Sequence, residues 1–178
     1  MDRGEPKEAP SQYWYLAALA LVIVGWMVGV AVAGGAWDAV RHARISSTNE
    51  ALQAQGSSVA VFTDVVQPDR QITCTMTDVV TDSRSTPVPP APIALEVEDD
   101  GTTWHLVAFQ PEGRNGVTVT CAPADKRVDN AQYAFATVDG FTERARVGNA
   151  VILASLLGAA LTSLIVFVRR RRALRQQR

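Results

Sequence analysis

The 178-residue chain has few of the side chains on which enzyme and metal chemistry depends: two histidines, two cysteines and two lysines. A structural zinc site usually needs four ligands at short paired spacings, which these residues do not have. Neither a Ser–His–Asp nor a Cys–His arrangement can be assembled convincingly from so few groups. We therefore expect no catalytic residue, no metal site, no cofactor and a role that is not enzymatic.

Charge is missing from two long segments, Tyr13–Trp37 and Val147–Val168. Each is longer than the roughly 20 residues that a helix needs to cross about 30 Å of hydrocarbon, and nothing in either is costly to bury in lipid. Aromatic side chains lie at both ends of the first run, as in the interfacial belts of membrane helices: Tyr13, Trp14, Tyr15 and Trp37. Both runs are predicted to be transmembrane helices.

A cleaved signal peptide is the competing interpretation of the first run, because Ala31-Val32-Ala33 resembles a cleavage site. The apolar stretch far exceeds the 7–15 residues typical of a signal-peptide core. The preceding residues 1–10 are also nearly neutral, with two basic and three acidic side chains. These features favour an uncleaved anchor.

The orientation is predicted from arginines around the second run. Six arginines follow it, and Arg144 and Arg146 lie just before it. The positive-inside rule places such a basic tail, which includes Arg169, Arg170, Arg171 and Arg172, in the cytoplasm. With two spans, we expect both termini to be cytoplasmic in the cell membrane and residues 38–146 to be extracytoplasmic.

The net charge of −1 hides an asymmetry between regions. Residues 38–146 carry nine basic and fifteen acidic side chains, a net charge of −6, which argues against binding nucleic acid. The tail has a charge of +6. The simplest interpretation of the tail is a stop-transfer signal, and anionic lipid headgroups are its possible partner.

Both cysteines, Cys74 and Cys121, fall in the segment predicted to be extracytoplasmic. Apolar and polar residues alternate strictly over 71–77 and 117–121, so each cysteine is expected to face the core from a strand. Disulfides persist in such compartments, and we predict one between these residues. Two free buried thiols or half of a metal site are the alternatives.

Further strand patterns predict a compact antiparallel β-sandwich of about six strands, with a small partly open barrel as the alternative. Asp99-Asp100-Gly101 predicts a hairpin turn, and the proline-rich segment 87–92 predicts a loop or an edge connection. The predicted regions are a cytoplasmic leader (1–12), a first span (13–37), a helical stalk (38–56), the β-sandwich (57–140), a linker with the second span (141–168) and a basic tail (169–178).

Small residues recur every four positions in both runs, at the spacing that lets helix backbones approach closely in lipid. The alternative is that glycine and alanine are simply common in such segments. The predicted packing residues are Gly25, Gly29 and Ala33 in the first run, and Ala150, Ala154, Gly158 and Thr162 in the second, with Ser155, Ala159 and Ser163 beside them.

Two further groups of residues could suggest a binding site but have simpler structural explanations. The acidic residues Glu96, Glu98, Asp99 and Asp100 lack the ligand pattern of a dedicated calcium loop and are interpreted as a solvated hairpin tip. His105, beside Trp104, can bind a ligand or sense pH, but a lone histidine on a β surface is usually inert.

The chain resembles a loose group of small actinobacterial two-pass membrane proteins with a disulfide-bonded β domain and an arginine-rich tail. The resemblance rests on Ile72-Thr73-Cys74-Thr75, Gly116-Val117-Thr118-Val119-Thr120-Cys121, Tyr133-Ala134-Phe135 and Arg169–Arg172. Val117 stands where the group often has an aromatic residue. The resemblance implies topology and fold, and no catalytic or binding residue.

The architecture favours a non-enzymatic accessory subunit or assembly factor of a larger cell-envelope complex, with an integral membrane protein complex as its partner. The alternative is a tethered module that binds or senses an envelope component or ion, with a concave apolar or aromatic patch around Trp104 and Tyr133. Self-association as a structural protein is a third possibility.

Overall fold

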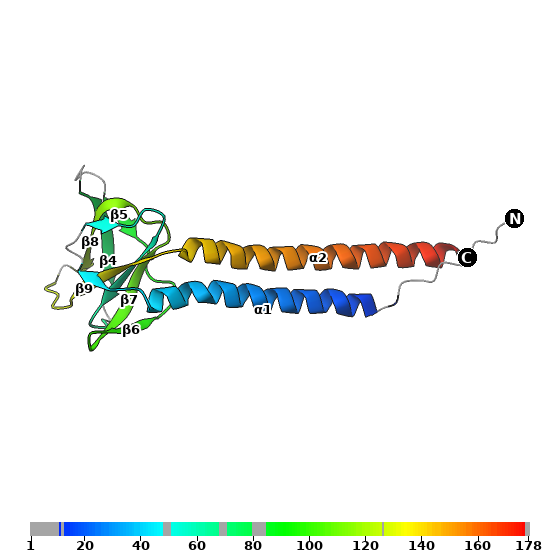
Figure 1. The fold of residues 1–178 in the computed structure, drawn as a ribbon, viewed down its shortest axis with the longest axis horizontal. Helices are drawn as coiled ribbons and strands as arrows, with labels where there is room; N and C mark the ends of the chain where they lie inside the picture. Colours follow the sequence, from blue (N-terminus) through cyan, green and yellow to red (C-terminus); the bar gives the residue numbers. More distant parts are fainter. Residues whose placement is uncertain are drawn as a thin grey trace. The chain divides into compact units, whose positions relative to one another are not determined.

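The computed structural model describes residues 11, 13–47, 51–67, 71–79, 85–125 and 127–176. The chain divides into two compact units, residues 34–145 and residues 1–33 with 146–178. Figure 1 shows the strands gathered in the first unit and two long helices in the second. The predicted leader, apart from Ser11, and residues 177–178 of the tail lie outside the described residues.

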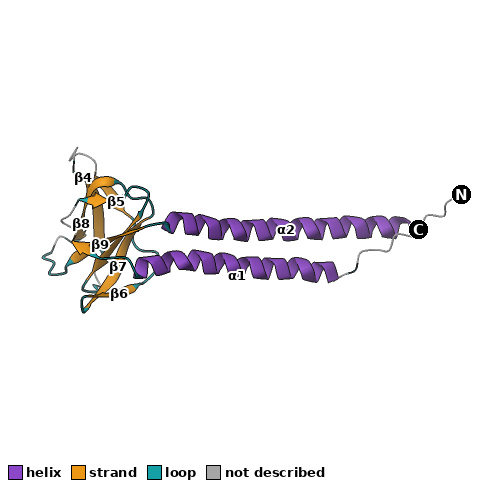
Figure 2. Cartoon of the chain, in the orientation of Figure 1, coloured by secondary structure: helices purple, strands orange, loops and turns teal. Residues whose placement is uncertain are grey.

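Two helices, α1 (Tyr13–Arg41) and α2 (Phe141–Gln176), flank the β strands in the sequence (Figure 2). Each contains an 18-residue window with a mean hydropathy of 2.6, of which 11% is buried. By length and composition, both are able to cross a membrane. Each helix extends beyond its apolar run, because the flanking residues are mostly good helix formers such as Ala, Arg, Leu and Gln.

The strands form two antiparallel sheets, in the order β1-β9-β3-β7-β6 and β2-β8-β4-β5. The predicted antiparallel β-rich domain between two apolar helices is therefore confirmed. The strand bounds are β1 Ser46–Ser47, β2 Leu52–Gln53, β3 Ser58–Thr63, β4 Ile72–Asp78, β5 Ser85–Val88, β6 Glu96–Asp99, β7 Thr102–Gln110, β8 Asn115–Pro123 and β9 Tyr133–Val138.

The five-stranded sheet is buried on both faces, which explains why every residue of its central strand β3 is buried. Val59 and Val61 of β3 belong to a core cluster shared with residues of the four-stranded sheet. Ala60 and Phe62 point the opposite way, into a second cluster, which we call the outer core. An uninterrupted apolar strand of this kind requires cover on both sides.

The outer core is closed by the ends of the two helices. Ala36 and Val40 of α1 are fully buried there, and Phe141 of α2 is 8% exposed. Trp37 packs between them, with ring centroids 5.0 Å from Phe109 and 4.9 Å from Phe141. The 34–145 unit therefore has three layers, which are the helix ends, the five-stranded sheet and the four-stranded sheet.

The predicted helical stalk over 38–56 is wrong beyond Arg41, where α1 ends. The chain next adds β1 to the edge of one sheet and β2 to the edge of the other. Ile45-Ser46-Ser47 forms helix poorly, and pairing with the sheets buries Leu52 to 1% exposure. Burial in the sandwich therefore outweighs the modest helix propensity of 51–54. Residues 48–50 of the predicted stalk are not described.

The hairpin prediction is confirmed, because Asp99 pairs with Thr102 and the strands β6 and β7 run antiparallel from that turn. Asp100 has φ 47° and Gly101 has φ 78°. Positive φ at both central positions is what a type I′ turn requires, and Asp-Gly supplies it at low cost. Pro87 lies in β5 at the edge of its sheet, where a missing amide donor is tolerated.

Candidate functional site

The predicted disulfide between Cys74 and Cys121 is present, and it links directly opposed residues of the neighbouring strands β4 and β8. Their Cα atoms are 4.0 Å apart, and the bond closes a sequence separation of 47 residues. Met76 and Val119, two residues along each strand, lie in the same inter-sheet core as Cys74. Thr73, on the opposite face, donates its hydroxyl to the carbonyl of Ala122 at 3.1 Å.

In the unit formed by residues 1–33 and 146–178, α1 and α2 contact each other at glycine residues. A Cβ atom on Gly148 would lie 2.7 Å from the carbonyl oxygen of Gly29 and 3.0 Å from the Cβ of Ala33. Likewise, a Cβ on Gly25 would overlap the side chain of Ser155. The backbones are thus too close for any larger residue at these positions, which is the packing that small residues permit between helices in lipid.

The side of each helix that faces the other is defined by burial as well as by glycine contacts. It follows steps of three and four residues, the spacing at which side chains share one face of a helix. The sequence prediction followed steps of four residues with Ser155 and Ala159 beside them, and it missed Gly148 and Ile152. The residues that are buried on these sides or lie against the other helix are Ala18, Leu21, Val22, Gly25, Gly29 and Ala33 on α1, and Gly148, Ile152, Ser155, Gly158, Ala159 and Val166 on α2.

The small residues predicted in the second run are divided between two faces of α2. Gly158 faces α1, because a Cβ there would lie 3.1 Å from Leu21, and Thr162 is half-buried. Ala150 and Ala154 are exposed and take no part in the α1–α2 contact. One helical turn separates these two alanines, so they form a small-residue patch on the outer side of α2.

The arginines of the tail continue α2. Arg169, Arg170, Arg171 and Arg172 are all exposed on the helix. Arg169 also lines a recess of about 270 Å³ between the two helices, together with Trp14 of α1 and with Thr162, Ile165 and Val166 of α2. Sequence reasoning did not connect Trp14 with the tail, since only an antiparallel hairpin brings the two together.

The β domain has a largely apolar recess of about 410 Å³ at one end of the sandwich. His105 and Glu96, opposed on β7 and β6, both line it, with His105 Nδ1 3.3 Å from the Glu96 carboxylate. The apolar lining comes from both sheets and the connections between them: Val65, Val66, Ile72, Pro90, Ala94, Leu95, Leu106 and Val107.

The predicted aromatic patch around Trp104 and Tyr133 does not form on one surface. Trp104 packs against the outer core, on the same face as Val97. Tyr133 is opposite Thr63, whose other neighbour is His105 in the recess. The hydroxyl of Tyr133 donates to Asp129 at 2.5 Å. The two aromatic residues therefore lie on opposite faces of the five-stranded sheet.

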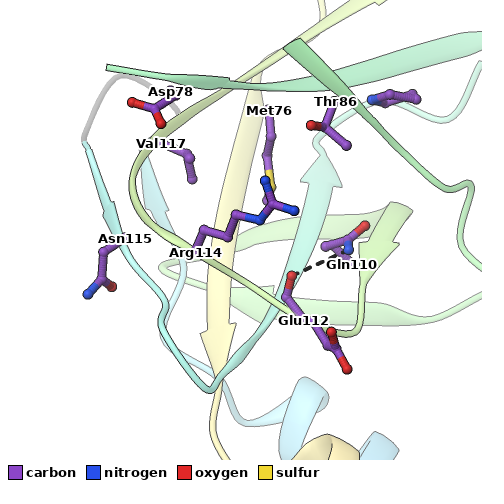
Figure 3. Close-up of a pocket in the computed structure, with 9 residues that line it drawn as sticks. Met76, Asp78, Thr86, Gln110, Glu112, Arg114, Asn115 and Val117 are labelled. Carbon is purple, nitrogen blue, oxygen red and sulfur yellow. Dashed lines mark hydrogen bonds between the residues drawn. The ribbon is translucent and has the colours of Figure 1, made fainter. Parts of the chain in front are cut away.

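Figure 3 shows a smaller and more polar recess near Met76, with a volume of about 90 Å³. The side chain of Arg114 extends along it, and Gln110 Nε2 donates to the carbonyl of Glu112 at 3.3 Å. This volume is below the range of about 300–1,000 Å³ found for small-molecule sites. The recess has room for water or a small ion but not for an organic ligand.

The acidic residues around Asp99 surround the β6–β7 turn and are mostly exposed. Within the described ranges, no three His, Cys, Asp or Glu side chains are grouped as metal ligands.

Comparisons with known proteins give no family for this chain. No family model matches it, and neither the curated proteins nor the solved structures contain a significant match.

Proposed function

We propose that the chain is a non-enzymatic accessory subunit or assembly factor anchored in the cell membrane by α1 and α2. The observation that carries this proposal is the outward-facing pair Ala150 and Ala154, which the α1–α2 contact leaves exposed. Small residues one turn apart allow another helix to approach the backbone of α2 closely. A larger membrane protein is the partner that fits such a surface.

The placement of the β domain outside the cytoplasm is part of the same proposal. The Cys74–Cys121 disulfide supports it, because such bonds persist in oxidising compartments. The six arginines after the second apolar run support a cytoplasmic C-terminus by the positive-inside rule. Leu156, Leu157 and Leu161 are among many exposed apolar side chains of α2, as expected for a surface solvated by lipid.

The test is affinity purification from native membranes in mild detergent, through a tag at the C-terminus. We expect wild type to recover a defined membrane complex in stoichiometric amounts. The double variant Ala150→Leu/Ala154→Leu should reduce that recovery about tenfold or more, because the added side chains separate the helices. Ala160→Leu is the matched control, since Ala160 is also exposed but lies on a different side of α2.

Two results would contradict the proposal. One is recovery of the chain alone or only with its own copies. The other is equal recovery of the complex by wild type and by the double alanine variant, which would mean that this face of α2 makes no contact with the partner.

A second candidate function is ligand binding by the β domain, favoured by the recess beside His105. Its volume of about 410 Å³ lies within the range of small-molecule sites, and one polar pair, His105 with Glu96, lies in a mostly apolar lining. A ligand of this site would protect the domain against thermal unfolding in wild type but not in Val66→Trp, whose ring would occupy the recess from an exposed lining position.

A further inference from the structure

The recess between Trp14 and Arg169 combines an apolar interior with a cationic end. Ile165 and Val166 line it on α2, and Trp14 lines it on α1. Arg169 comes one turn after Ile165, at the start of the run of four arginines. The recess therefore suits a ligand with an apolar body and an anionic head.

The two helices differ in where they end. Gly29 lies against Gly148, Gly25 against Ser155 and Leu21 against Gly158. If both helices rise equally per residue, the first turn of α1 comes level with about residue 166 of α2. The arginines from 169 onward therefore extend beyond the start of α1, at the end of the interhelical groove.

The first turn of α1 adds to the positive field at this position. It contains no acidic residue, and the positive end of a helix dipole favours a nearby anion. Tyr13 N donates to Ser11 Oγ at 3.3 Å. Trp14 itself is 55% exposed, as is common for tryptophan at the level of lipid headgroups.

We propose that this recess is a binding site for one anionic phospholipid. The guanidinium of Arg169 binds the phosphate, for which its planar set of donors is well suited. An acyl chain lies against Ile165 and Val166, and the ring of Trp14 covers the glycerol region. This inference rests on the membrane anchoring in the proposed function, but not on the presence of a partner complex.

In this proposal Arg169 has a role that the other arginines of the tail do not share. A stop-transfer signal needs only positive charge near the end of a span, so any arginine contributes. A lipid site needs a cation at the recess, and among the four consecutive arginines only Arg169 lines it. Arg175, also exposed on α2, is the matched control because its removal changes the charge equally.

The test is native mass spectrometry of the full chain released from vesicles of phosphatidylglycerol and phosphatidylcholine in equal amounts. We expect one phosphatidylglycerol to stay bound to wild type. Arg169→Gln should weaken its retention about tenfold, a typical effect of losing a charge-assisted contact, and Arg175→Gln should change it less than twofold. Trp14→Ala should weaken the retention of both lipids. Glycerol 3-phosphate, which lacks acyl chains, should not compete.

Several results would contradict the proposed phospholipid site. Equal losses in Arg169→Gln and Arg175→Gln would assign lipid binding to the overall charge of the tail. Equal retention of the two lipids would remove the anionic preference, and competition by glycerol 3-phosphate would indicate a site for a free anion. A lipid-free dimer would identify a second copy as the occupant.

Failure of this site can be distinguished from failure of the proposed function. Extraction of wild type from the vesicles by alkaline carbonate would refute membrane anchoring and the site together. Lipid selectivity without recovery of a partner complex from native membranes would refute only the accessory role.

Discussion

Three glycines determine how closely α1 and α2 approach. Gly25, Gly29 and Gly148 each lie where a Cβ atom would meet the other helix at less than 3.0 Å. Gly34 differs from them, since a Cβ atom there has nothing within 4 Å. Similar residues in one apolar helix thus have different roles, and only the contact surface distinguishes them.

We predict that Gly148→Leu disrupts the helix pair, because the side chain would overlap the Gly29 carbonyl and Ala33. Overpacking of a close contact typically costs about 1–3 kcal/mol. The loss of stability can be measured by titration with a denaturing detergent, following α1–α2 proximity by a pair of fluorophores. Gly34→Ala is the control and should leave that proximity unchanged. Equal effects of the two variants would show that Gly148 is not part of the contact.

At the level of elements, the disulfide links the two inner strands of the four-stranded sheet. β8 and β4 lie between the edge strands β2 and β5, and β2 is only two residues long. The bond therefore joins the central pair of strands in this sheet, each of which also pairs with an edge strand.

We predict that Cys74→Ala/Cys121→Ala lowers the free energy of unfolding by up to about 4 kcal/mol. This value follows from the entropy of an unfolded chain that is no longer closed into a loop of 47 residues. Thermal melts of the full chain with and without reductant would measure it. A reductant should destabilise wild type but not the double variant, and unchanged melting of reduced wild type would contradict the prediction.

The sequence predicted elements well where the pattern was local. Strict alternation around Cys74 and Cys121 identified two core-facing positions, and Asp100-Gly101 identified a turn with positive φ. Elements stabilised by distant partners were not predictable. Residues 46–47 and 52–53 form strands only because the edges of β9 and β8 are available to them.

The candidate sites were less accessible to sequence reasoning than the fold. The small-residue spacing identified Gly25 and Gly29, but their counterpart Gly148 depends on the register of an antiparallel helix pair. The same register brings Trp14 to Arg169, which are distant in the chain. Likewise, the recess at His105 is formed by four separate segments, so no local motif indicates it.

At the scale of the whole molecule, the predicted topology can be tested with single thiols, because both native cysteines are in the disulfide. Thr103→Cys is exposed on the β domain and Leu174→Cys is exposed near the end of α2. In intact cells stripped of any outer layer, a membrane-impermeant maleimide should label Thr103→Cys directly. It should label Leu174→Cys only after permeabilisation. The reverse pattern would contradict the orientation derived from the arginines.

The outer core makes the fold of the β domain dependent on residues of both helices. Its apolar interior is completed by Ala36 and Val40 of α1 and by Phe141 of α2. Proteolytic cleavage just after Arg41 and just before Phe141 would release a sandwich in which Phe62 and Phe109 are uncovered. Such a fragment would aggregate instead of remaining a folded soluble domain, because a large apolar surface would be exposed to water. The folded β domain therefore depends on segments of both α1 and α2. A soluble fragment for study must include residues 34–145.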